Sequence, residues 1–112
     1  GDVTAEIDEA ERATGTRVRT ADVDLFDDLD GAAALVAAMD LVITTGSTTA
    51  QVSGALGVPT WVLLSRGPGL MWYWGHGDRT PWYPTMRLFR QQVPGDWTLP
   101  VAEAAAALTA FR

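Results

Sequence analysis

The stretch of sequence best suited to bind a phosphate group is a short run of small and hydroxylated residues, Gly46, Ser47, Thr48 and Thr49. It lies between an apolar, β-branched run and a stretch with a helical pattern. A turn of this kind offers unpaired backbone N–H groups at the positive end of the helix dipole, which favours phosphate. The alternative is an ordinary N-capped helix, because the run matches neither GxxxxGK[ST] nor GxGxxG.

A second candidate segment is the loop over residues 65–83, which at about 19 residues is long for a compact domain and is therefore expected to be functional. It is rich in Gly and Pro and carries five aromatic residues, Trp72, Tyr73, Trp74, Trp82 and Tyr83. These rings could stack on a nucleobase or a sugar, cover a partner domain, or form a local hydrophobic plug. Arg66 is the best-placed phosphate cation, although an exposed arginine without a ligand is equally consistent with the sequence.

Residues for catalysis by side chains are scarce. The single histidine, His76, lies between two glycines and is interpreted as a solvated loop residue. No cluster of His, Asp or Glu has the spacing of metal ligands, and the absence of cysteine excludes thiolate sites and disulfides. Ser47 and Ser65 lack the sequence of a nucleophile elbow. We therefore predict no catalytic residue, no metal site and no cofactor.

The elements that must position these residues alternate between helical patterns and short apolar runs. Strands are expected at residues 17–19, 41–44, Thr60–Leu64 and 87–89, and helices at residues 3–10, 31–39, 50–56 and 100–111, the last with a start as early as Thr98. This alternation predicts an α/β fold, a Rossmann-like parallel sheet of about four strands with helices on both faces.

Ligands of such sheets bind beyond the carboxyl ends of the strands, where both candidate segments lie. The most apolar strands, and the helix between them, should supply a core that includes Val42, Leu56, Trp61 and Leu63.

The composition indicates one globular domain of 112 residues, with 47% hydrophobic residues and a net charge of −6. The acids crowd the first 40 residues, every base is an arginine, and no basic face of a nucleic-acid-binding protein is visible. No run approaches the roughly 20 apolar residues of a membrane span, and no signal peptide opens the chain, so a cytoplasmic location is expected. Because the chain begins at Gly1 within a helical pattern, we expect a domain excised from a longer protein.

Three segments carry a family resemblance: DLVITTGSTTAQVSGALGVPTWVLL at residues 40–64, TPWYPTMRLFRQ at residues 80–91 and PGDW at residues 94–97. They resemble the C-terminal glycosyltransferase-like domain of bacterial tetratricopeptide-repeat proteins, which are related to the heptosyltransferase family (glycosyltransferase family 9). The PWYP box followed by RLFRQ is the more specific part. The resemblance covers roughly residues 20–111.

The resemblance implies the C-terminal half of a GT-B architecture, which in the family binds the nucleotide-sugar donor. Ser47 and Thr48 correspond to the family's phosphate-contacting turn. The donor-binding residues expected on this basis are Gly46, Ser47, Thr48, Thr49, Gln51, Arg66, Trp82 and Tyr83. The partners implied are a nucleoside-diphosphate sugar, a protein or glycan acceptor, an N-terminal GT-B half and tetratricopeptide repeats.

Two positions depart from the family pattern, since Gly46 stands where many relatives carry Asp and Gln51 where they carry His. These departures favour an alternative, a catalytically degenerate domain that serves as an interaction or dimerisation module. On either interpretation the isolated chain should transfer no sugar, because only one wall of the cleft is present. Its exposed aromatic residues should favour a homodimer.

Overall fold

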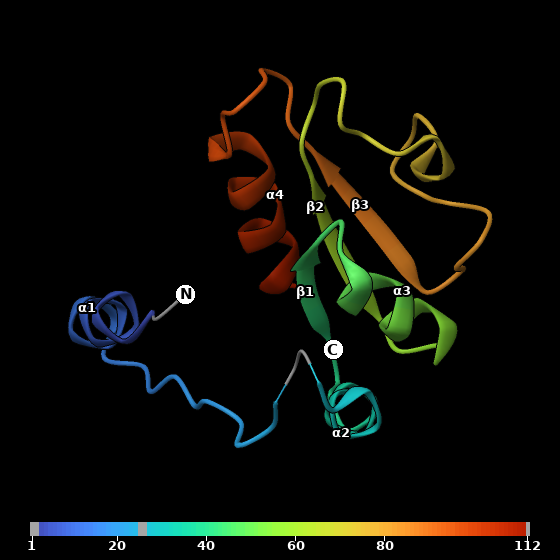
Figure 1. The fold of residues 1–112 in the computed structure, drawn as a ribbon. Helices are drawn as coiled ribbons and strands as arrows, with labels where there is room; N and C mark the ends of the chain where they lie inside the picture. The colour runs from blue at the N-terminus through green and yellow to red at the C-terminus, as the bar shows by residue number, and fades with distance from the viewer. Residues whose placement is uncertain (1–2, 25–26, 112) are drawn as a thin grey trace.

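The computed structural model describes residues 3–24 and 27–111 (Figure 1). In chain order the elements are α1 (Thr4–Thr14), α2 (Leu29–Ala37), β1 (Val42–Thr45), α3 (Thr48–Ala55), β2 (Thr60–Leu64), the 3-10 turn η1 (Trp72–Trp74), β3 (Met86–Arg90) and α4 (Thr98–Leu108). Helices therefore alternate with strands over most of the chain, which confirms the α/β class.

The three strands form one sheet in the order β1-β2-β3, and both pairings are parallel. Val42 of β1 pairs with Thr60 of β2, which in turn pairs with Met86 of β3. The expected strand at residues 17–19 is wrong, because residues 16–20 have no regular secondary structure and are all exposed. The run alternates in sequence, but Val18 is its single apolar side chain and is itself 43% exposed, so no apolar face holds the run against the sheet.

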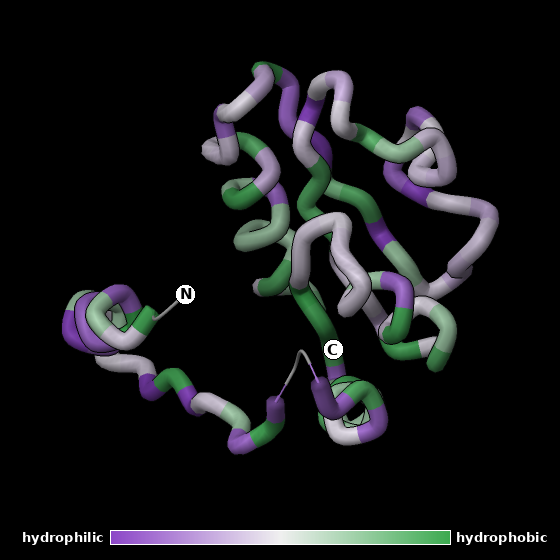
Figure 2. The backbone as a smooth tube through the Cα atoms, in the orientation of Figure 1, coloured by the Kyte–Doolittle hydropathy of each residue, from purple (hydrophilic) through white to green (hydrophobic). Residues whose placement is uncertain are grey.

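Apolar side chains cover both faces of the sheet, because successive residues of a strand point to opposite sides. On one face Val62, Leu64 and Met86 pack with Ala50 of α3. On the other face Trp61 and Phe89 pack with Ala104 of α4. Helices on both faces are thus confirmed, and Figure 2 shows the hydrophobic residues concentrated along the strands.

The predicted core is correct for one of its four members. Trp61 is 7% exposed, whereas Val42 and Leu63 are only half-buried. Leu56 is 49% exposed and its predicted burial is wrong. It caps the carboxyl end of α3, where the chain turns away through Gly57 and buries Val58 instead.

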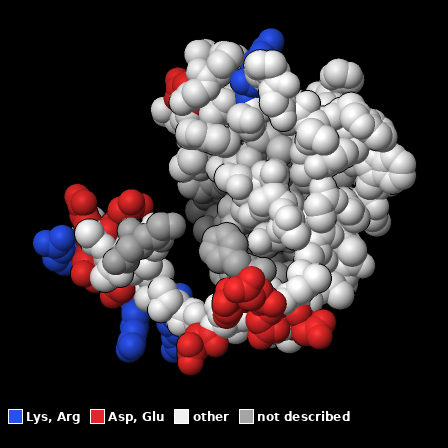
Figure 3. Space-filling view, viewed as in Figure 1, with Lys and Arg blue, Asp and Glu red and all other residues white. Residues whose placement is uncertain are grey.

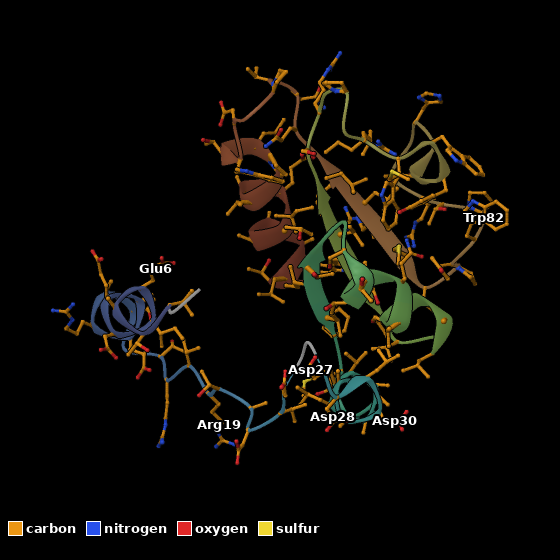
Figure 4. The ribbon with its side chains drawn as sticks, in the orientation of Figure 1. Glu6, Arg19, Asp27, Asp28, Asp30 and Trp82 are labelled. Atoms are coloured by element: carbon orange, nitrogen blue, oxygen red, sulfur yellow. The ribbon has the colours of Figure 1, made fainter. Side chains whose placement is uncertain are left out.

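Helix α1 lies apart from the sheet and has no buried residue (Figure 1). It continues beyond the expected residue 10 to Thr14 and is followed by Gly15, whose φ of 70° is a conformation that favours glycine. Most of the acidic surface in Figure 3 lies over α1 and α2, and Figure 4 shows Asp27, Asp28 and Asp30 near α2. No helix in the described part of the chain combines the length and the apolar character of a membrane span.

Candidate functional site

The carboxyl ends of the three strands lie along one edge of the sheet, because the strands are parallel. Three adjoining cavities lie along this edge and under the loop that follows β2. The strand-end cavity, about 600 Å³, is lined by Ser65, Arg66, Gly67, Leu70, Met71, Trp72, Gly75, His76, Arg90, Gln91 and Gln92. The turn cavity, about 310 Å³, is lined by Thr45, Gly46, Leu63, Leu64, Ser65, Gly69, Leu70, Met71, Trp74 and Trp97. The aromatic cavity, also about 310 Å³, is lined by Gln51, Trp72, Tyr73, Trp74, Thr80, Trp82 and Tyr83.

The first turn of α3 is not capped by a side chain. Ser47 occupies the N-cap position, but its hydroxyl donates to the carbonyl of Thr45 (3.2 Å) rather than accepting from the helix. Among the described residues no acceptor reaches the backbone N–H groups of Thr48, Thr49 or Ala50. The ordinary N-capped helix considered from the sequence is therefore not what forms here, and the donors stay available.

A side chain at Gly46 would be crowded. A Cβ atom at this position would lie 3.1 Å from Cδ2 of Leu64 and 3.4 Å from Nε1 of Trp74. The φ of Gly46 is not positive, so backbone strain does not select glycine here. Glycine lets the turn lie directly over the buried ring of Trp74, which is 2% exposed.

Arg66 lies two residues beyond the end of β2, and both Arg66 and His76 line the strand-end cavity. The Arg66 backbone N–H donates to Oε1 of Gln91 (3.0 Å), and its Nη1 makes a long bond to the carbonyl of Gln92 (3.4 Å). Gln91 is 2% exposed, and its Oε1 also accepts from the N–H of Gly95 (3.0 Å). One buried amide therefore ties together the segments that follow β2 and β3.

Arg90 shapes the same wall from the end of β3. Its guanidinium donates to the carbonyls of Trp74 (2.7 Å), Gly75 (2.9 Å) and Gly77 (2.8 Å), so it fixes the loop around η1. Partial burial lowers the pKa of Arg90, because desolvation disfavours the charged form. Sequence reasoning missed Arg90 and Gln91, although the run RLFRQ at the end of a predicted strand was a signal for both.

The loop aromatics divide into a plug and a surface. Trp74 is buried in the main core, whereas Trp72 and Trp82 are 77% and 59% exposed. The rings of Trp72 and Trp82 meet edge to face at 6.3 Å between centroids. Trp82 lies at the outer margin of the molecule in Figure 4. Both the plug and the exposed stacking surface considered from the sequence are therefore present, in different residues.

Gln51 and Tyr83 bind each other. The Tyr83 hydroxyl donates to Oε1 of Gln51 (2.5 Å), and the Tyr83 ring lies against Gly54 of α3. A Cβ atom at Gly54 would be 2.6 Å from Cγ of Tyr83. This contact fastens the PWYP segment to α3.

The expected site residues fall into two groups. Gly46, Ser47, Thr48, Thr49 and Arg66 lie at or next to the carboxyl ends of β1 and β2, while Gln51, Trp82 and Tyr83 surround the aromatic cavity. The two groups adjoin, because Trp72 lines both the aromatic and the strand-end cavity. No cluster of three His, Asp or Glu side chains suited to a metal ion occurs among the described residues.

Fold and site together define an α/β domain with a three-stranded parallel sheet and cavities at its carboxyl edge. No family model matches the sequence, and no solved structure matches it. Protein FlbA of Caulobacter vibrioides is similar, with 35% identity over 112 residues that cover 99% of this chain. The chain spans only 18% of the length of FlbA.

Proposed function

We propose that this domain is the donor-binding half of a glycosyltransferase, in which it holds a nucleoside-diphosphate sugar. The observation that carries the proposal is the uncapped start of α3 at the carboxyl edge of the sheet. The backbone N–H groups of Thr48 and Thr49, both exposed residues, have no acceptor there and follow Gly46, which lines the turn cavity. Helix N-termini in this position are phosphate-binding sites in many α/β proteins.

The electrostatics around this turn favour an anion. Arg66, one strand away, can supply a counter-charge to the diphosphate. Eleven of the 14 acids lie in residues 1–40, which include α1 and α2. No acidic side chain among the described residues lines any of the three cavities. The negative net charge is therefore not located at the proposed binding surface.

The rings of Trp72 and Trp82 offer a surface on which a sugar or a nucleobase could stack. The remaining parts of the enzyme would come from outside this chain: an N-terminal Rossmann-like half to complete a GT-B cleft, and tetratricopeptide repeats to present a protein or glycan acceptor. A chain that covers 18% of FlbA is consistent with this division. The proposal places the domain in the cytoplasm.

A second candidate function is an interaction or dimerisation module that keeps the fold without donor binding. The observation that favours it is the engagement of Gln51 by Tyr83, which removes one expected donor contact, together with the two exposed tryptophans. Such rings are enriched at protein interfaces.

The test is calorimetric titration of the full-length protein with UDP-, GDP- and ADP-sugars, and with a CMP-sugar, which carries a single phosphate. The informative variant is Thr48→Pro, since Thr48 is the first residue of α3, where proline is tolerated and removes one N–H donor. The matched control is Thr48→Ala, which keeps the N–H and removes the hydroxyl.

We expect one of the diphosphate sugars to bind. Thr48→Pro should weaken this binding by about 1.5–3 kcal/mol, the value of a hydrogen bond to a charged group, whereas Thr48→Ala should cost no more than about 1.5 kcal/mol. The melting temperature of either variant should be close to that of the parent. If no nucleotide-sugar or nucleoside diphosphate binds at millimolar concentration, the interaction module replaces the enzyme. If binding occurs but is indifferent to Thr48→Pro, the donor does not use the start of α3.

A further inference from the structure

The strand-end cavity contains a buried hydrogen-bond donor without a partner. Nε2 of Gln91 is buried and has no acceptor among the described residues, although buried polar groups are almost always hydrogen-bonded. The orientation of this amide is fixed by chemistry. Its Oε1 accepts from two backbone N–H groups, those of Arg66 and Gly95, and a flipped amide would place N–H against N–H. Nε2 is therefore a donor of fixed orientation, without a partner, in a residue that lines the cavity.

The ionisable side chains on the same wall are all bases. Arg66, His76 and Arg90 line the cavity, and no described Asp or Glu does so. Arg90 is held in place by three carbonyl oxygens and forms no ion pair within the described residues, so its charge stays uncompensated. Arg66 has one long hydrogen bond from its guanidinium and four more N–H donors to offer.

We infer that the strand-end cavity binds an oxyanion, the phosphoryl or carboxylate group of a small molecule, through Nε2 of Gln91 and the guanidinium of Arg66. A negatively charged group rich in acceptors would accept from the unpartnered amide and also pair with the guanidinium groups of Arg66 and Arg90. The start of α3 does not line this cavity, although the two sites could share Arg66. The inference does not depend on the proposed glycosyltransferase function.

The test uses inorganic phosphate and acetate as separate probes in calorimetric titrations of the full-length protein at constant ionic strength. The Thr48→Pro background is used throughout, so that phosphate at the start of α3 contributes little. Gln91→Glu keeps an oxygen facing the two backbone N–H groups but replaces the donor by a negatively charged oxygen. Val93→Glu is its control, because the same negative charge is added two residues along the chain, at an exposed side chain that does not line the cavity. Arg66→Gln tests the second ligand and leaves the backbone bond to Gln91 in place.

We expect at least one probe to bind with a dissociation constant of about 1 mM or tighter. Gln91→Glu should raise that constant at least tenfold, and Val93→Glu less than about threefold, because solvent screens an exposed charge. Arg66→Gln should also weaken binding severalfold, which keeps the test decisive if Gln91→Glu fails to fold. The identity of the bound probe then separates a phosphoryl from a carboxylate ligand.

Absence of binding by both probes up to about 10 mM, or equal effects of the Gln91 and Val93 variants, would mean that water satisfies Nε2, and the inference would be overturned. Loss of nucleotide-sugar binding without loss of probe binding would overturn only the proposed function.

Discussion

At Gly54 the ring of Tyr83 occupies the space that a side chain would need. Because Gly54 has no Cβ atom, the Tyr83 ring lies close enough to α3 for its hydroxyl to reach Gln51. The contact between these two distant segments therefore depends on the absence of a methyl group at Gly54. The contact also forms part of the aromatic cavity.

Gly54→Ala should lower the free energy of unfolding by about 1–3 kcal/mol, as in other overpacked sites. The new Cβ would lie 2.6 Å from the Tyr83 ring, which must move and break its bond to Gln51. Urea denaturation measures the change. Gly69→Ala is the control, since a Cβ at Gly69 meets no atom within 4 Å, and it should change the unfolding free energy by under about 0.5 kcal/mol. Equal midpoints for the two variants would show that Tyr83 does not pack on α3.

The sequence allows some residues to be placed and not others. Trp61 was predictable as core because it lies in the most apolar run of the chain. The exposure of Leu56 was not predictable, because it depends on where α3 ends and in which direction the chain leaves the helix. The role of Gln91 depends on the N–H groups of Arg66 and Gly95, and the first of these is 25 residues away in the sequence.

Among the secondary-structure elements, the three strands of the sheet could be predicted because β-branched and apolar residues dominate them and turn residues bound them. Residues 16–20 show why alternation alone misleads, since a strand needs both an apolar face and a neighbour to pair with. The start of α3 was predictable as a turn, but whether Ser47 caps it was not, because that depends on the orientation of a single hydroxyl.

Helix α4 shows how one side chain starts an element. It begins at Thr98, whose backbone N–H donates to Oδ1 of Asp96 (2.9 Å). This backbone hydrogen bond, assisted by the Thr98 side chain, lowers the pKa of Asp96 below its ordinary value of 3.8. The ionised carboxylate therefore favours the folded state.

Asp96→Ala should lower the melting temperature at pH 7, because the first turn of α4 loses its acceptor. The pKa of Asp96 is lower in the folded than in the unfolded chain, so the stabilisation is fully present above the unfolded value and is lost as the pH falls through the folded value. The difference in melting temperature between parent and variant should shrink accordingly between pH 5 and the acid limit of folding. Scanning calorimetry over that range measures it, and a constant difference would contradict the assignment of Asp96 as the cap.

At the scale of the whole molecule, charge and aromatic surface are separated. The acids gather around α1 and α2, and the exposed tryptophans lie on the loop between β2 and β3 (Figures 3 and 4). The clustering of acids in residues 1–40 is visible in the sequence. Their separation from the carboxyl edge of the sheet is not, because it depends on the path of the chain between the elements.

The isolated 112-residue chain should self-associate through its two exposed tryptophans. The rings of Trp72 and Trp82 meet and are both largely exposed, so they form one apolar surface. The double variant Trp72→Ser, Trp82→Ser should be monomeric at concentrations where the parent forms dimers in sedimentation velocity. Val3→Ser and Val18→Ser, at exposed positions outside this surface, serve as controls and should leave the association unchanged. A parent chain that remains monomeric at high concentration would contradict the prediction.

Because α1 lies apart from the sheet, its sequence should tolerate more substitutions than the sequence of the core. Within this chain residues 4–14 bury no side chain, so nearly any soluble, helix-forming sequence would satisfy that segment. Residues 42–64 offer little such freedom, because Ala50, Ser53, Thr60 and Val62 are completely enclosed and any change of volume there is felt. A saturation mutagenesis library should accordingly show a tolerant first quarter and an intolerant centre. In distant homologues the central segment should remain alignable after the first helix has diverged too far to compare.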